Sequence, residues 1–293
     1  MWIFFYFVIA IGLFTLQNIC FKQFNSKFMQ NTDSYFIFSA IYFALICGIY
    51  LAFGLDTSVF TLPAIALGLM FAVSFILAMF FYMKAMEHGP LGLSFLFFSA
   101  GMLWPILFGI IVHNQPAPLH NGVGLVLLFI ALYVSTRKPK AETSGRLSRT
   151  WVKFILLSSV CNGIIGIAIQ LFSMVVHSYG VTEFLFLSFG QAAIISLVVG
   201  TVLLIKNKGN LSHFRKPAFA WVALGTAVTT AGGNYIMVAL TMLVSALLQF
   251  PVINGALVIT SILASRIVFK EKVTKNQFIA IAVGLAAIIL LSI

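Results

Sequence analysis

Hydrophobic and polar positions in this chain alternate on the scale of whole segments. Ten apolar stretches follow one another almost from end to end, separated by short polar connections. An apolar run of about 18 residues or more crosses a bilayer as a helix, because a helix satisfies its own backbone hydrogen bonds inside the hydrocarbon core. The helices expected from this pattern are 2–20, 35–54, 62–83, 91–112, 119–135, 151–176, 183–205, 217–239, 244–269 and 276–293.

A polar segment divides these stretches into two sets of five. Residues 136–150 form the longest polar connection, and its basic residues are Arg137, Lys138, Lys140, Arg146 and Arg149. A segment so short and so charged cannot pack a core of its own. The expected organisation is a first five-helix repeat at 1–135, a cytoplasmic linker at 136–150 and a second five-helix repeat at 151–293.

The two sets share features in the same order. Thr32-Asp33 recurs as Thr182-Glu183, Gln17 aligns with Gln170, and the segment 114–135 aligns with 271–292. Five is an odd number, so the second set enters the membrane in the opposite sense from the first. The sequence therefore predicts an all-α polytopic membrane protein with ten transmembrane helices arranged as two inverted five-helix repeats, an organisation that places a substrate site near the midplane.

Composition agrees with a chain made almost wholly of membrane spans. Hydrophobic residues make up 61% of the sequence and charged residues 8%, and the mean hydropathy is +1.10. Such a chain leaves no room for a separate soluble domain. Its three cysteines lie in or beside apolar stretches, so we expect no disulfide framework.

The basic residues indicate how the chain crosses the membrane. All 17 lysines and arginines fall in, or at the helix ends beside, connections that follow odd-numbered helices. Because cytoplasmic loops collect Lys and Arg, every odd connection is predicted inside and both termini outside. This partition explains the net charge of +11, so we expect a bilayer and no nucleic acid as partner. The expected location is a bacterial plasma (inner) membrane.

The sequence contains no arrangement typical of an enzyme or of a metal or cofactor site. Its five histidines are not spaced as paired ligands on a helix, and no phosphate-binding loop or nucleophile elbow occurs. All six acidic residues lie in connections or at helix ends, so no carboxylate is expected at midplane depth. We therefore expect no catalytic residues, no cofactor and no metal.

Neutral polar side chains within the apolar stretches are the candidates for a substrate site. Three asparagines, Asn162, Asn234 and Asn254, would offer uncharged amides if their helices face one cavity, which suits a neutral or zwitterionic solute. The alternative is that such amides join helices to one another, and that Trp104 is an interface anchor. The other candidate substrate-binding residues are Gln249, Gln191, Ser99, Trp104, Tyr82 and Tyr235.

The segment 249–277 resembles the corresponding part of a known family. Pro251 and the Asn254-Gly255 pair lie in the ninth helix, Phe269-Lys270-Glu271-Lys272 ends it, and Gln277 opens the tenth. These elements are similar to the end of a drug/metabolite transporter of the EamA-like type. The resemblance implies a five-plus-five arrangement of helices and transport of a small metabolite, often outward. Small multidrug resistance proteins, which are related, use a carboxylate in their first helix, where this chain has Gln17 and Asn18.

The predicted function is secondary transport, as an exporter or exchanger, of a small polar or zwitterionic organic solute such as an amino acid or related metabolite. Alternating access between the halves is the expected mechanism. The alternatives are efflux of drug-like cations, and a lipid flippase or non-catalytic membrane partner subunit. Because one chain holds both repeats, we expect a monomer, with a homodimer as the alternative.

Overall fold

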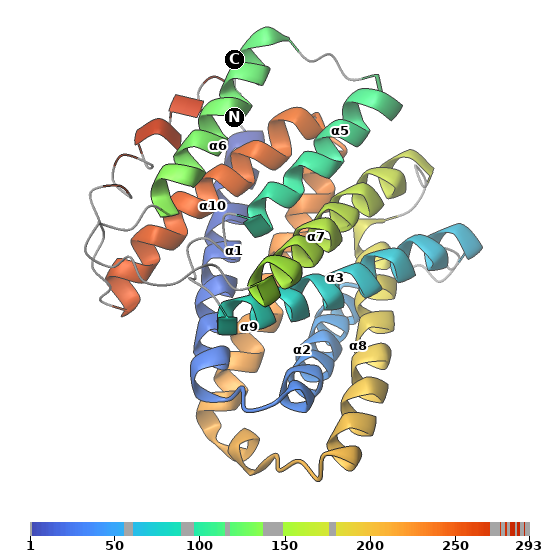
Figure 1. Cartoon of the computed structure of the whole chain (residues 1–293). Coiled ribbons are helices and arrows are strands. Elements are labelled where there is room, and N and C mark those ends of the chain that lie inside the picture. The colour runs from blue at the N-terminus through green and yellow to red at the C-terminus, as the bar shows by residue number, and fades with distance from the viewer. Residues whose placement is uncertain are drawn as a thin grey trace. The chain divides into compact units, whose positions relative to one another are not determined.

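The computed structural model describes residues 2–55, 61–88, 97–114, 118–136, 149–175, 180–269 and single positions between 276 and 290 (Figure 1). In this part of the chain the secondary structure is helical. The elements are α1 (Trp2–Lys27), α2 (Thr32–Ala52), α3 (Leu62–His88), η2 (Ala100–Met102), α5 (Leu103–Val112), α6 (Leu119–Thr136), α7 (Arg149–Val175), α8 (Val181–Lys206), η4 (Ser212–Arg215), α9 (Pro217–Thr241) and α10 (Ala246–Phe269).

Seven of the described helices are long and apolar enough to cross a membrane, which confirms a polytopic α-helical membrane protein. They are α1, α2, α3, α7, α8, α9 and α10. Helices α1 and α3 run beyond their expected ends, so Lys84 lies inside α3. The expected tenth helix falls mostly outside the described residues. The arrangement as ten helices in two inverted repeats stays a prediction.

The expected helix at 91–112 differs from a continuous α-helix in its described part. Residues Ala100–Met102 form a 3₁₀ turn before α5 begins, and the Leu103 N–H bonds to the Ala100 carbonyl. Pro105 has no N–H, so it cannot donate to the Gly101 carbonyl four residues earlier. A tighter turn just before the proline is the local solution, because 3₁₀ bonds span three residues instead of four.

Contacts divide the chain into two compact units that cut across the expected repeats. The first unit contains Met1–Phe7, Leu77–Gln170 and Leu243–Ile293, and the second contains Val8–Ile76 and Leu171–Met242. Helix α3 is therefore shared, with its N-terminal part in the second unit and its C-terminal part in the first. The division at 1–135 and 151–293 is a division of sequence and stays a prediction.

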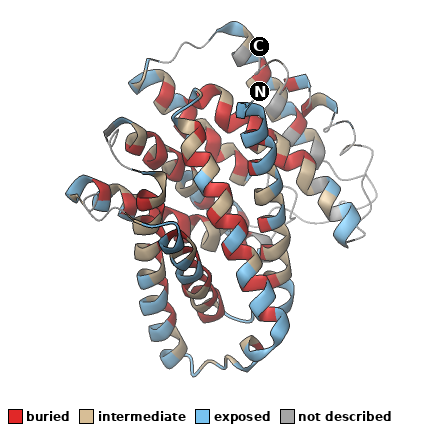
Figure 2. Ribbon diagram, turned by 180° about the vertical axis from the view of Figure 1, so that it is seen from behind, coloured by how far each residue is buried: buried red, intermediate tan, exposed pale blue. Residues whose placement is uncertain are grey.

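Helix α2 is the centre of the second unit and packs against α8 and α9. Tyr35 and Tyr42 are fully buried on it, and α2 carries buried residues along its length (Figure 2). Gly200 lets α8 approach closely, because a Cβ there would lie 2.9 Å from Ile37 Cδ1. Small residues at such contacts are typical of membrane helices, which associate through close packing.

The first unit joins α7 to the C-terminal part of α3 and places α10 beside α5 and α6. Trp151 and Ile155 of α7 pack with Ala85 of α3 in a buried cluster. Below this cluster, Ser158 Oγ donates to the Ala78 carbonyl at 2.7 Å, both atoms being buried. This buried hydrogen bond fixes α7 against α3.

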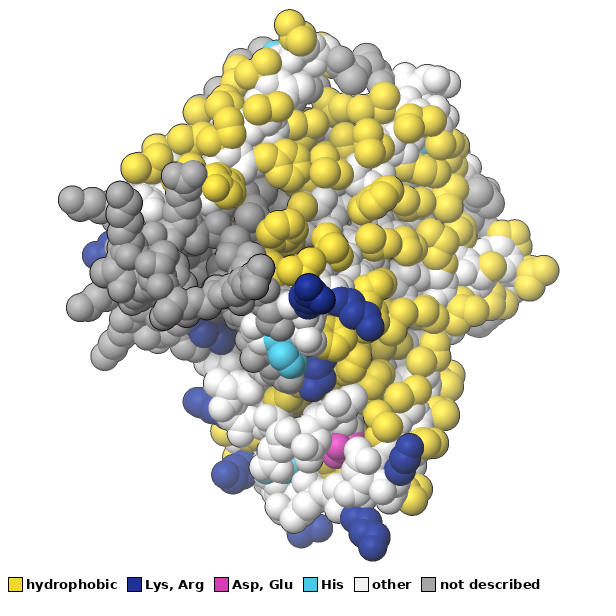
Figure 3. Space-filling model, viewed as in Figure 1, with side chains coloured by type: hydrophobic (Ala, Val, Ile, Leu, Met, Phe, Trp, Pro, Cys, Tyr) yellow, Lys and Arg dark blue, Asp and Glu magenta, His cyan; other side chains and the backbone are white. Residues whose placement is uncertain are grey.

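The outward faces of the helices are apolar, as the bilayer requires. On α8, the side chains of Ile194, Val198, Val202 and Ile205 are 58–73% exposed and recur every three or four residues. Figure 3 shows such hydrophobic side chains over much of the surface. A soluble protein would not expose so much apolar surface, so this face is the one that contacts lipid. The protein is an integral membrane protein.

Candidate substrate site

Asn162 of α7 binds the interrupted helix of the first unit. Its Nδ2 donates to the Phe98 carbonyl at 3.1 Å, just before the 3₁₀ turn of Ala100–Met102. A turn that changes its bonding pattern leaves carbonyl groups with weakened partners, and a side-chain amide can supply one. This contact of Asn162 Nδ2 joins two helices, which is the alternative role predicted from the sequence for such amides.

Two glycines of α7 allow the interrupted helix to lie close beside it. A Cβ on Gly163 would overlap the Trp104 side chain, and one on Gly166 would lie 2.7 Å from Pro105 Cγ. One turn further, Gln170 Nε2 donates to the Pro105 carbonyl at 2.8 Å. Trp104 is thus packed on α7 along one edge while 48% of its surface stays exposed.

Tyr82 and Ser99 lie around the same interruption. The Tyr82 ring is 4.8 Å from the Phe98 ring, centre to centre. Ser99 is 1% exposed, and its Oγ has no hydrogen-bond partner among the described residues. A buried hydroxyl without a partner is costly, so Ser99 stays a candidate for contact with a solute. The structure therefore brings four sequence candidates together, namely Tyr82, Ser99, Trp104 and Asn162.

Helix α10 reaches α7 through Phe250, between the two candidates that α10 carries. A Cβ on Gly166 would lie 3.1 Å from Phe250 Cε1, one turn from Asn162. Gln249 is fully buried, and Asn254 Nδ2 donates to the Phe250 carbonyl of its own helix at 2.8 Å. Pro251 interrupts the bonding of α10 at this level, because it has no N–H to donate. The first unit thus holds six of the nine candidates.

The other three candidates lie in the second unit. Gln191 Nε2 donates to the Ile65 carbonyl of α3 at 3.2 Å, and its buried Oε1 has no partner among the described residues. Asn234 Nδ2 donates to the Thr230 carbonyl at 2.9 Å, and Tyr235 is 44% exposed. Each candidate is placed within its own unit, and their convergence on one cavity stays a prediction.

Sequence reasoning missed two polar contacts of the second unit. Gln17 Nε2 of α1 donates to Thr230 Oγ1 of α9 at 2.7 Å, and Tyr50 OH of α2 donates to the Ala231 carbonyl at 2.8 Å. The alignment of Gln17 with Gln170 was a usable signal, since both amides are buried and both join helices. Tyr50 gave no such signal, because its place near a helix end is typical of an interface anchor.

The contacts around residues 98–105 are chemically neutral. They consist of amides, hydroxyls, aromatic rings and the backbone carbonyls of Phe98 and Pro105. Asp33 and Glu183, whose side chains are described, lie in the first turns of α2 and α8, away from the helix centres. Among the described residues no group of three or more His, Cys, Asp or Glu could hold a metal ion. These groups offer hydrogen-bond donors and acceptors and aromatic faces, and binding of a solute beside them stays a prediction.

Comparison with known proteins gives the family. The model of the EamA-like transporter family matches residues 149–293. One solved crystal structure, described only as that of a protein, is similar to this chain with a TM-score of 0.72 and a sequence identity of 14%. The match covers 98% of this chain and 94% of the other chain. At that identity it shows a shared fold alone. No curated protein matches. Through residues 149–293 the chain belongs to the EamA-like transporter family of the drug/metabolite transporter superfamily, whose members are membrane transporters.

Proposed function

We propose that the protein is a secondary transporter that exports or exchanges a small polar or zwitterionic organic solute, such as an amino acid, by alternating access. The observation that carries this proposal is a matched set of contacts. Under the expected repeat, α1 corresponds to α7, α2 to α8 and α3 to α9. Gln17 joins α1 to α9, and Ser158 joins α7 to α3, so counterparts pair with counterparts.

A second matched set supports the same correspondence. Tyr50 joins α2 to α9, and Gln191 joins α8 to α3. Helices expected to be counterparts also pack on each other, as α2 does on α8 and α5 on α10. Two repeats related by an axis in the membrane plane bring counterpart helices together in this way.

Counterpart helices contact different neighbouring helices in this structure. Alternating access requires such a difference between the two repeats. Residues 8–27 of α1 belong to the second unit, whereas residues 149–170 of α7 belong to the first. Their aligned glutamines accordingly bind different helices, Gln17 on α9 and Gln170 on the segment that begins α5. We infer that the opposite state exchanges these environments, so that Gln170 binds α3 and Gln17 binds α10.

The neutral contacts around residues 98–105 favour a neutral or zwitterionic solute over a cation. A permanently charged drug-like cation would need a nearby carboxylate or a cage of rings, because burying a charge unpaired is costly. The Tyr82 and Phe98 rings supply one aromatic wall at most. Efflux of drug-like cations is the alternative function.

The test is uptake by proteoliposomes of labelled amino acids, amines, sugars and drug-like cations, compared with protein-free liposomes. The expected result is saturable uptake of a zwitterionic or neutral solute, and a smaller thermal stabilisation by that solute in the variant Ser99→Ala than in the native protein. Saturable uptake of cations alone would contradict the substrate class. Scrambling of labelled lipid without any solute uptake would replace transport of solutes by lipid flipping.

A further inference from the structure

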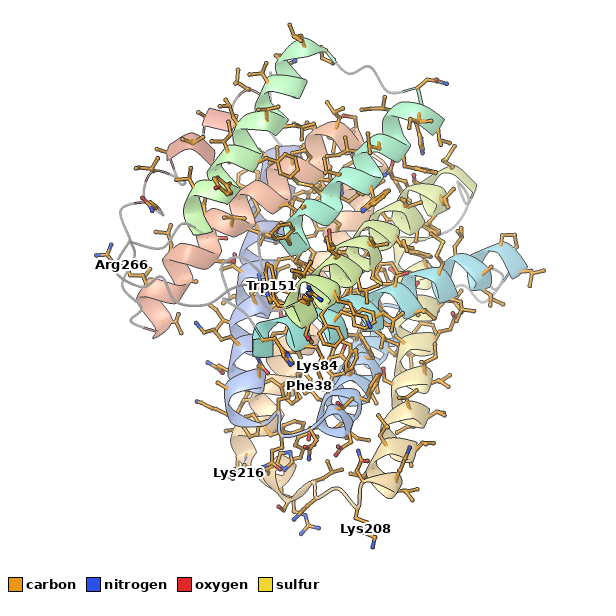
Figure 4. The ribbon with its side chains drawn as sticks, viewed as in Figure 1. Phe38, Lys84, Trp151, Lys208, Lys216 and Arg266 are labelled. Atoms are coloured by element: carbon orange, nitrogen blue, oxygen red, sulfur yellow. The ribbon has the colours of Figure 1, made fainter. Side chains whose placement is uncertain are left out.

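The second unit carries all its basic residues at one end. Residues 8–76 and 171–242 contain six, which we call the basic rim: Lys22, Lys27, Lys206, Lys208, Arg215 and Lys216. Five of these side chains are exposed, and Lys22 is half-buried. Figure 4 shows Lys208 and Lys216 on the connection between α8 and α9, and Figure 3 shows dark blue side chains gathered at this end.

Aromatic packing holds the rim's elements in fixed positions. The rings of Phe24 on α1 and Phe38 on α2 stack at 3.8 Å, and those of Phe214 on η4 and Phe219 on α9 stack at 4.2 Å. Phe28 closes the set at 5.6 Å from Phe219. The end of α1 and the start of α9 are thereby joined, so the cations they carry share one surface.

Among the described residues of its own unit, the rim has no exposed acidic side chain beside it. The acidic residues of the second unit are Asp33, Asp56 and Glu183. Asp33 lies at this end but is 1% exposed, and Glu183 begins α8, the helix that Lys206 ends. Asp56 lies outside the described residues. Exposed positive charge is therefore left for a partner of opposite charge to neutralise.

The apolar surface that meets the rim identifies the partner as lipid. Lys206 directly follows Ile205, whose side chain is 73% exposed on the lipid-facing side of α8. Trp221, 74% exposed near the start of α9, is an aromatic of the kind that sits at the headgroup level of a bilayer. A soluble polyanion would neutralise the charges but would not cover the exposed apolar side chains beside them. Lysines at helix ends place their charge among headgroups while their stems stay in the apolar layer.

We propose that the basic rim binds the anionic headgroups of phospholipids in the leaflet that it faces, and so enriches such lipids around the second unit. Clusters of four to eight basic residues beside membrane helices have this effect, each contributing about fivefold in affinity near the surface. The proposal concerns the surface of the second unit alone and does not depend on what the protein transports.

Trp221 is a natural reporter for this proposal. The purified protein is placed in nanodiscs of equal amounts of phosphatidylglycerol and phosphatidylcholine, with bromine on the chains of one lipid or of the other. The difference in quenching between the native protein and the variant Trp221→Phe gives the signal of this side chain alone. We expect brominated phosphatidylglycerol to quench Trp221 as though enriched about fivefold or more, and salt at about 1 M to reduce the enrichment, since it shortens the screening length to about 3 Å.

Two variants of equal charge test the location. The first replaces Lys206, Lys208, Arg215 and Lys216 by Gln, and the matched control replaces Lys84, Arg149, Lys153 and Arg266, which belong to the first unit. In the rim variant, which keeps Lys22 and Lys27, the two brominated lipids are expected to quench Trp221 to nearly the same extent, whereas the control variant is expected to keep the enrichment. Equal quenching in the native protein would overturn the proposal, as would equal loss in both variants. Displacement of the lipid by a short polyphosphate at low salt would indicate a soluble anion instead.

Discussion

The hydrogen bond between Gln17 and Thr230 allows a quantitative test of how α1 is held in the second unit. The changes are Gln17→Met and Thr230→Val, singly and together, since each removes the polar atoms with little change of volume. Gln17 is 5% exposed, Thr230 is fully buried, and the two atoms are 2.7 Å apart. Both side chains are buried, so the pair meets the conditions for a strong interhelical bond.

Double-mutant cycles on interhelical hydrogen bonds in membrane proteins average about 0.6 kcal/mol and reach about 1.7 kcal/mol. Short length and burial on both sides place this pair in the upper half of that range, at about 1–1.7 kcal/mol. The loss in Gln17→Met alone is softened, because the Thr230 hydroxyl can turn to a carbonyl of its own helix. Because each single variant loses the same bond, the double variant should still be more stable than the sum of the single losses implies.

The assay is reversible unfolding in mixed micelles of detergent and sodium dodecyl sulfate, followed by tryptophan fluorescence. Gln191→Met provides the comparison, because its bond to Ile65 is longer, at 3.2 Å, and Gln191 is half-buried. We expect its cost to lie below about 0.6 kcal/mol. A coupling near zero between Gln17 and Thr230, with the single variants folded, would refute the assignment of this bond as a fastening of α1 to α9.

Three further changes have expected outcomes. Ser99→Ala should leave the free energy of unfolding unchanged or raise it slightly, because the Oγ has no described partner to lose. The same variant should raise the KM for the transported solute about twofold to tenfold. Ser158→Ala, which loses a 2.7 Å bond, should do the reverse: lower stability by about 0.6 kcal/mol with KM unchanged. Gly163→Val should destabilise by about 1–3 kcal/mol in the same unfolding assay through its clash with Trp104. Gly12→Val, with nothing within 4 Å of its Cβ, is the control that should be nearly neutral.

The length of the apolar runs was sufficient to predict most of the helices, because a segment that crosses the bilayer must satisfy its own backbone hydrogen bonds and must be long enough to span it. It could not show the 3₁₀ turn at Ala100–Met102, although Pro105 marks the place. Helix ends were misjudged where a helix continues past the apolar layer, as α1 does to Lys27. A hydropathy pattern shows which residues lie in the apolar layer of the membrane. It does not show where the helix itself ends.

The candidate site was predictable in kind but not in contacts. Buried amides could be found in the sequence, yet whether an amide joins helices depends on which carbonyl lies opposite. Asn162 bonds to Phe98 where Gly101, in the 3₁₀ turn, lies close against Asn162 and where Gly163 lets Trp104 lie close against α7. Gln17 was not among the candidate residues, and its partner Thr230 is far away in sequence. Pairings of this kind follow from packing, which one sequence does not encode locally.

Exchange across proteoliposomes tests alternating access most directly. Vesicles are loaded with the labelled solute identified by uptake, and its efflux is timed with and without the same unlabelled solute outside. A carrier that exposes one site to each side in turn should release label faster when external solute is present, because a loaded carrier returns more readily than an empty one. Efflux that does not saturate and ignores external solute would indicate a pore and contradict the account.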